Sequence, residues 1–68
     1  MGTYKQRLKE SPKAYSNGTD IMYCNVATSG VIVINFNAKF FSYKTYDGYN
    51  RKAKELIKKY NLVETIYN

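Results

Sequence analysis

The chain of 68 residues contains no histidine and only one cysteine, Cys24. A single cysteine rules out an internal disulfide, and without histidine a zinc site is effectively excluded. Domains of this length often need disulfides, a metal or self-association to become stable. Eight tyrosines and three phenylalanines indicate that aromatic packing or oligomerisation takes that place here.

Long apolar segments are also missing, because no run approaches the roughly 20 residues that a membrane-spanning helix needs. Residues 1–10 are polar and charged, so no signal peptide is expected. A lone free thiol suits a reducing compartment. These features predict a cytoplasmic protein with no membrane partner. Hydrophobic residues make up 44% of the chain, too many for a disordered tail, so one small domain over residues 1–68 is expected.

Acidic residues are few: five stand against eleven lysines and arginines, which gives a formal net charge of +6. This sign favours polyanionic partners such as DNA, RNA or acidic protein surfaces. The same charge is equally typical of a small domain that only needs to stay dissolved. The five carboxylates are scattered, and no glycine-rich phosphate loop is present. The sequence therefore predicts a protein that is not an enzyme and holds no cofactor or metal.

Two strands are predicted in the middle of the chain. Val31–Phe36 is the longest β-branched apolar run, which is typical of a strand covered on both faces. Residues 19–27 alternate, with Met22, Cys24 and Val26 on one face and Ile21, Tyr23 and Asn25 on the other. The link between the strands, residues 28–30, is too short for a parallel crossover, so the pair must be antiparallel.

A helix is predicted over residues 49–60, because apolar residues recur there at helical spacing. This stripe comprises Tyr49, Ala53, Leu56, Ile57 and Tyr60. Thr45 or Asp47 would cap the helix, with Asp47 favoured as a cap over a catalytic role, and Asn61 would end it.

Four other segments allow less definite predictions. Residues 3–10 form either a short helix or a flexible basic arm, and residues 11–18 form a connector with a turn at 16–18. Residues 40–44 are either a third strand or the end of one long bent strand from residue 31. Residues 62–68 form either a final strand at the sheet edge or an extended tail.

The fold predicted from these segments is α+β: a small antiparallel sheet of two to four strands with one amphipathic helix packed on one face. The order is (α)-β-β-(β)-α-β, with residues 18–68 as the core and residues 1–17 as a short helix or arm. One helix covers one face of a sheet, so the other face must meet water, the N-terminal segment or another molecule. A homodimer through that face is expected.

The candidate binding residues lie on and beside the predicted helix. Arg51, Lys54 and Lys58 are spaced three and four apart, so they share a stripe that could contact phosphates. The alternative is an ordinary solvated helix surface. Lys44, Tyr43 and Tyr46 mix cationic and aromatic groups, as single-strand nucleic-acid surfaces and protein interfaces do. For these tyrosines the alternative is packing at the edge of the core.

From Gly18 onward the pattern resembles that of small uncharacterised proteins encoded by tailed phages. The matching segments are Thr19-Asp20-Ile21, the strand from Gly30 to Asn35, Thr45, and Asn50-Arg51 in the basic helix. The resemblance implies a phage accessory protein in the cytoplasm of a bacterial host. It brings no catalytic residues.

The function expected from these features is a non-enzymatic phage-type binding protein that engages host or phage nucleic-acid machinery through the basic helix and tyrosines. The target would be a protein or a nucleoprotein, and the outcome could be inhibition. Two alternatives are a stand-alone nucleic-acid-binding module and a structural or assembly protein of the virion.

Overall fold

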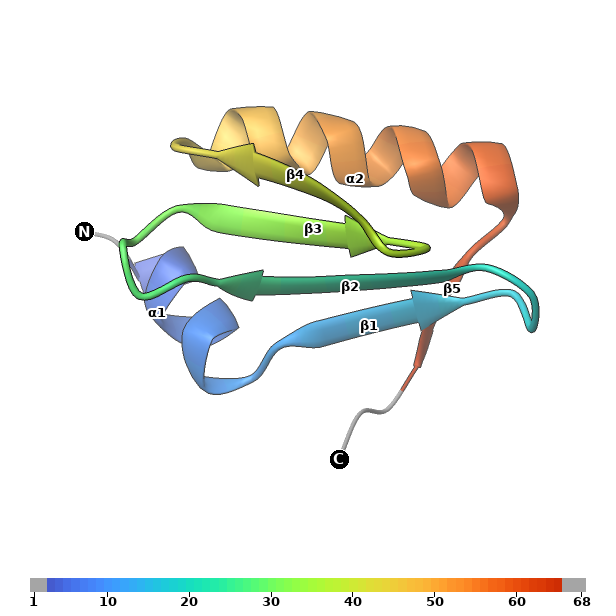
Figure 1. Cartoon of the computed structure of the whole chain (residues 1–68), viewed down its shortest axis with the longest axis horizontal. Helices are drawn as coiled ribbons and strands as arrows, with labels where there is room; N and C mark the ends of the chain where they lie inside the picture. The colour runs from blue at the N-terminus through green and yellow to red at the C-terminus, as the bar shows by residue number, and fades with distance from the viewer. Residues whose placement is uncertain (1–2, 66–68) are drawn as a thin grey trace.

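The computed structural model describes residues 3–65 and has two helices and five strands in that range (Figure 1). In chain order these are α1 (Thr3–Glu10), β1 (Lys13–Ser16), β2 (Ile21–Val26), β3 (Ile32–Phe36), β4 (Lys39–Tyr43), α2 (Tyr46–Tyr60) and β5 (Val63–Thr65). The strands form one antiparallel sheet in the order β4-β3-β2-β1-β5. The predicted α+β class is confirmed.

The sheet has one strand more than the sequence predicted, because the expected connector over residues 11–18 contains β1. This strand pairs with β2 on one side and with β5 on the other. Its four residues carry little alternation of their own. Pairing on both sides, rather than an apolar pattern, makes this segment a strand. Of the predicted strand over residues 62–68, Val63–Thr65 lies at the sheet edge as β5, and residues 66–68 lie outside the described residues.

A tight hairpin turn separates β3 from β4, which settles the choice between two strands and one bent strand. Phe36 pairs with Lys39, so only Asn37 and Ala38 form the turn. Both have positive φ, 51° and 72°. Two successive residues in this conformation match the type I′ turn, whose twist suits an antiparallel hairpin.

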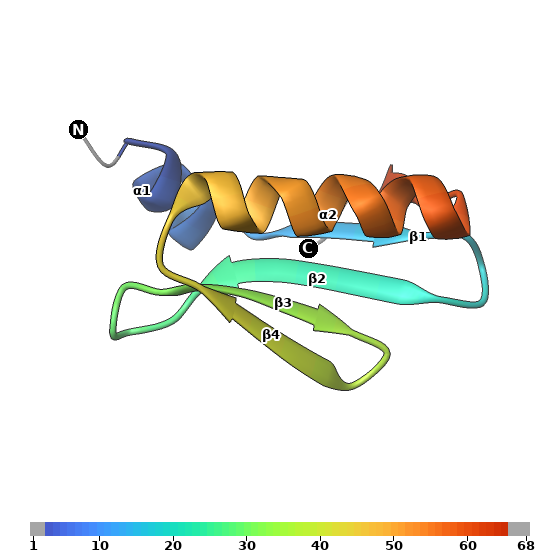
Figure 2. The same ribbon diagram turned by 90° about the horizontal axis from the view of Figure 1, so that it is seen from above.

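Both helices lie on the same face of the sheet (Figure 2). The core between them and the sheet contains Leu8 of α1, Met22 and Cys24 of β2, Ile32, Ile34 and Phe36 of β3, and Tyr49, Ala53 and Leu56 of α2. Of the two predicted alternatives for residues 3–10, the structure shows the short helix and not the flexible arm. Its Leu8 is only 2% exposed and belongs to the core. Since α1 packs against β2 on the same face as α2, the N-terminal segment does not cover the other face.

The prediction that Val31–Phe36 is covered on both faces is therefore wrong. Ile32, Ile34 and Phe36 are buried under the helices, but Val33 and Asn35 point to the opposite face and are only half-buried. For β2 the predicted division of faces is confirmed, because Met22 and Cys24 are fully buried whereas Ile21 is exposed.

Candidate functional site: the basic side of α2

Helix α2 is fixed at both ends by its own sequence. Thr45 is the N-cap: its hydroxyl oxygen accepts a hydrogen bond of 3.3 Å from the Gly48 amide. Asp47 is instead a first-turn residue, where its negative charge suits the helix dipole. At the other end Asn61 adopts the left-handed conformation, and its amide donates to the carbonyl of Ile57. The predicted stop at Asn61 is confirmed, and of the two predicted caps Thr45 is the correct one.

The apolar stripe of α2 faces the sheet, as predicted. Tyr49, Ala53 and Leu56 are buried, and Ile57 and Tyr60 pack against the core from its edge. The opposite side of the helix consequently faces solvent. This orientation decides which cations are available to a partner.

Arg51, Lys54 and Lys58 form one exposed row along the outer side of α2, and we call these three residues the basic row. The ion pairs among the described residues are Lys13–Glu64 and Lys52–Glu55, so the basic row takes part in neither. Lys58 follows Arg51 by seven positions, which corresponds to about 10 Å along the helix axis. Three cations at this spacing can each meet a different phosphate of one nucleic-acid backbone.

The neighbouring lysines of α2, Lys52 and Lys59, interact with other side chains of the same domain. Lys52 lies 3.7 Å from Glu55 and also 4.9 Å from the centre of the Phe41 ring. The Lys59 ammonium lies 5.6 Å from the centre of the Tyr60 ring. Cations over aromatic faces are held by the ring quadrupole and lose some freedom to reach a partner. The basic row therefore stands out from the other cations of this helix.

The other three predicted binding residues are dispersed. Lys44 is exposed in the link between β4 and α2, and Tyr46, in the first turn of α2, is 42% exposed. The Tyr46 ring lies 5.9 Å from the Tyr49 ring. Tyr43 packs at the edge of the core, where its ring lies close enough to Gly48 that an added Cβ there would come within 3.1 Å. The structure thus groups Arg51, Lys54 and Lys58, sets Lys44 and Tyr46 near the start of α2, and turns Tyr43 inward.

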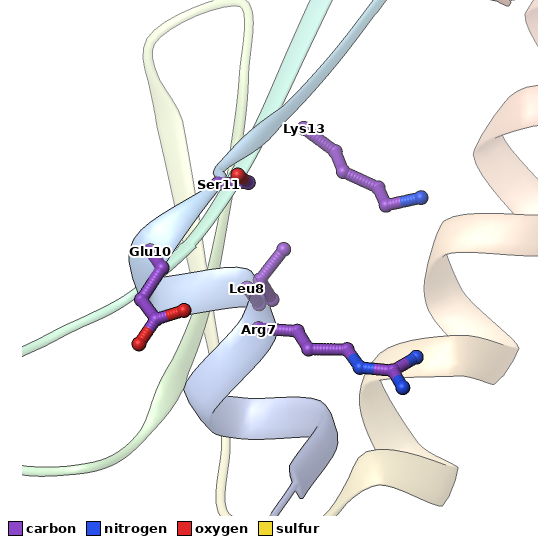
Figure 3. A pocket seen from close by; sticks show the side chains of 5 residues that line it. All are labelled: Arg7, Leu8, Glu10, Ser11 and Lys13. Atoms are coloured by element: carbon purple, nitrogen blue, oxygen red, sulfur yellow. The ribbon is translucent and has the colours of Figure 1, made fainter.

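A second basic feature, which the sequence did not single out, lies where α1 meets β1 (Figure 3). Arg7, Leu8, Glu10, Ser11 and Lys13 line a hollow of about 350 Å³. In Figure 3 the side chains of Arg7 and Lys13 both extend towards α2, whereas Glu10 points away from them. Lys13 also lies 3.6 Å from Glu64 of β5. The two cations line one hollow because α1 lies on the face of the sheet to which Lys13 of β1 points, an arrangement that their spacing in the sequence does not indicate.

Cys24 is completely buried in β2. Burial raises the pKa of its thiol to about 11, outweighing the opposite effects of a hydrogen bond with Tyr49 and the charge of Lys13. A thiol that stays protonated at neutral pH is a poor nucleophile. No group of three or more histidine, cysteine, aspartate or glutamate side chains within residues 3–65 could hold a metal ion. None of the helices in that range is long and apolar enough to cross a membrane.

In comparisons with known proteins, no family model, no curated protein and no solved structure matches this chain.

Proposed function

We propose that the protein is a non-enzymatic binding protein whose helix-bearing side contacts nucleic acid, either bare or within a nucleoprotein. On the resemblance described above, the target would belong to the nucleic-acid machinery of a phage or of its bacterial host. Support comes from the distribution of charge over the fold, from the exposed basic row, and from the lack of reactivity expected for the buried thiol.

The observation that carries the proposal is that the charged residues of the described helices and strands lie on one side of the sheet. Three strand residues within the described range are charged, Lys13, Lys39 and Glu64, and the pairing register puts all three on the face that the helices cover. Both helices add their own charges on that side. Ten of the eleven basic residues thus belong to the helix side, and Lys44 in the link before α2 is the eleventh.

A one-sided positive surface suits a polyanion, because neutralising phosphates releases the counterions condensed on them. The basic row would supply about three phosphate contacts. For duplex DNA the logarithm of the binding constant should then fall with the logarithm of salt concentration with a slope of about −2.7. Binding should weaken by about 40-fold between roughly 50 and 200 mM salt.

The test is fluorescence anisotropy with labelled duplex DNA, single-stranded DNA and RNA, measured over a range of salt concentrations. The basic row is neutralised in a triple variant, R51Q/K54Q/K58Q. A matched variant, K5Q/K9Q/K39Q, loses the same charge from α1 and β4. We expect the first variant to lose nearly all binding and the salt slope, and the second to keep most of both.

Two results would overturn the proposal. One is an absence of binding to all three nucleic acids at low salt. The other is a loss of affinity in K5Q/K9Q/K39Q that equals or exceeds the loss in R51Q/K54Q/K58Q, since the basic row would then not be the contact that the proposal requires.

A further inference from the structure

The sheet face opposite the helices, here called the open face, carries no charged residue among the described strands. The register gives it eleven strand positions: Ala14, Ser16, Ile21, Tyr23, Asn25, Val33, Asn35, Phe40, Ser42, Val63 and Thr65. One lateral row crosses the full width of the sheet through Thr65, Ala14, Tyr23, Asn35 and Phe40. In an antiparallel sheet with one solvated face, that face ordinarily carries polar side chains, so a face that mixes exposed apolar residues with no charge at all calls for an explanation.

Exposed apolar side chains gather on the same face. The large hydrophobic residues that stand exposed within the described range are Ile21, Phe40, Tyr46 and Val63. Three of these four belong to the open face, where Ile21 is 58%, Phe40 70% and Val63 67% exposed. They come from β2 and from both edge strands, so they are spread over the face. Tyr23 and Val33 lie on the same face among them, and apolar surface gathered on one side in this way marks an interaction site.

We propose that the open face binds the open face of a second copy of this chain. Its polar residues are asparagine, serine and threonine, whose side chains both donate and accept hydrogen bonds. Such groups can pair with their own copies across a two-fold axis, which an isologous interface requires. A surface of lysines or of carboxylates could not do so, because like charges would meet.

The position of the charges also favours a second copy over a charged partner. An acidic or basic partner finds no opposite charge among the strand residues of this face. In a dimer through the open faces, the two basic helix layers point outward on opposite sides. Two sheets packed face to face lie about 10 Å apart, and each helix layer lies on the far side of its own sheet. The two basic helix layers are therefore separated by more than the Debye length, which is about 8 Å at physiological salt. Screening then reduces their repulsion.

The size of the face sets the strength of the dimer. Five strands about 4.8 Å apart and about five residues long give a flat area of roughly 400 Å² per copy. This is below the ~800 Å² per partner of a standard interface and matches the smaller, transient class. The dimer should therefore be weak and should dissociate on dilution, and its affinity depends on how well the two faces fit and not on area alone. The prediction is independent of the proposed function, because it involves the opposite side of the molecule.

The experiment is sedimentation equilibrium of the full chain from about 5 µM to about 1 mM, at low and high salt. The variants Ile21→Glu, Phe40→Glu and Val63→Glu each place a carboxylate at an exposed position of the open face. The matched control, Gln6→Glu, adds the same charge at an exposed position of α1. Circular dichroism checks that each variant folds. The three substitutions lie on three different strands, so if one variant fails to fold the other two still test the proposal.

We expect a monomer–dimer equilibrium that high salt does not weaken. Each open-face variant should raise the dissociation constant more than about tenfold, because a carboxylate in the interface loses hydration without gaining a partner, whereas Q6E should leave it unchanged. A wild-type protein that stays monomeric at about 1 mM would overturn the proposal. So would association that the open-face variants do not affect. Loss of single-stranded RNA binding in F40E, with the oligomeric state unchanged, would instead assign the face to nucleic acid.

Discussion

The side-chain amide of Asn17 donates a hydrogen bond of 2.7 Å to the carbonyl oxygen of Tyr60, the last residue of α2. The same side chain accepts hydrogen bonds from the backbone amides of Thr19 and Asp20, at 2.8 and 2.7 Å. One residue in the β1–β2 loop thus orders its own turn and holds the C-terminal end of the helix, where carbonyl groups lack intrahelical partners.

Replacing Asn17 with alanine should therefore lower the free energy of unfolding by about 1–2 kcal/mol, because several hydrogen bonds are lost together. Urea denaturation measures the change. The control is Asn50→Ala in α2, which should cost little because alanine is the best helix former. An N17A variant as stable as N50A would show that the contact between the loop and α2 contributes nothing.

The hairpin between β3 and β4 offers an opportunity for stabilisation. Ala38 has a φ of 72°, a conformation in which its Cβ is strained, whereas type I′ turns favour glycine. Ala38→Gly should raise the free energy of unfolding by about 0.5–1 kcal/mol, the amount by which relieved strain exceeds the added freedom of the unfolded chain.

The reverse change, Gly18→Ala, provides the control. Gly18 has a φ of 95°, and a Cβ added there would meet nothing within 4 Å, so any loss of stability comes from the backbone alone. Thermal denaturation should move in opposite directions for the two variants. A destabilised A38G variant would contradict this account of the turn.

The elements with strong patterns of their own were predictable from the sequence. The apolar spacing of Tyr49, Ala53 and Leu56 predicted which side of α2 packs on the sheet. The opposite side, with Arg51, Lys54 and Lys58, was therefore predicted to be exposed. Strand β1 was not predictable in this way, because its four residues carry little apolar alternation and one of its two partners, β5, lies near the other end of the chain. The shared hollow lined by Arg7 and Lys13, and the packing of Tyr43 against the core, likewise depend on tertiary structure that local spacing does not encode.

The orientation of the sheet is a second feature that the sequence alone did not determine. The sequence predicted that the helix covers one face, left water, the N-terminal segment or another molecule for the other, and gave the two alternating sets of β2 residues correctly. It did not determine which set faces outward, because that depends on the face of the sheet on which the helices pack. In the structure Leu8 of α1 lies in the same core as Met22 and Cys24, so Ile21, Tyr23 and Asn25 are the set that faces outward.

The N-cap of α2 can be tested directly. Thr45→Ala should lower the free energy of unfolding by about 1 kcal/mol, because the Gly48 amide loses its acceptor. Asp47→Asn should cost less than about half of that, since it removes only an exposed charge near the helix N-terminus. Equal losses, or a larger loss for D47N, would show that Asp47 and not Thr45 begins the helix.

The raised pKa of Cys24 predicts a pH dependence of stability. The thiol ionises near its ordinary pKa of 9.0 in the unfolded chain but only at about 11 in the folded protein. Between these two pH values the Cys24 thiol is protonated in the folded protein and ionised in the unfolded chain. The free energy of unfolding should therefore fall as the pH rises from about 9 to about 11. Urea denaturation across this range should show the fall in the wild type and a weaker one in Cys24→Ala. Equal slopes in both proteins would contradict the assignment.

Reactivity gives an independent check of the same thiol. A thiol-specific alkylating reagent should label Cys24 only as fast as the fold opens, because the side chain is 0% exposed. A cysteine introduced at the exposed Ser29 position, in a background where Cys24 is alanine, should react immediately. Rapid labelling of native Cys24 would show that the core admits the reagent.

The central claim is that the helix side of this fold binds nucleic acid and that the open face does not. Its most direct test is a titration of isotope-labelled protein with duplex DNA at low salt, followed by heteronuclear NMR. The account predicts that chemical-shift changes concentrate on Arg51, Lys54, Lys58 and their neighbours along α2. Changes concentrated instead on Tyr23, Val33 and Phe40 would contradict it, because the binding surface would then be the uncharged face of the sheet.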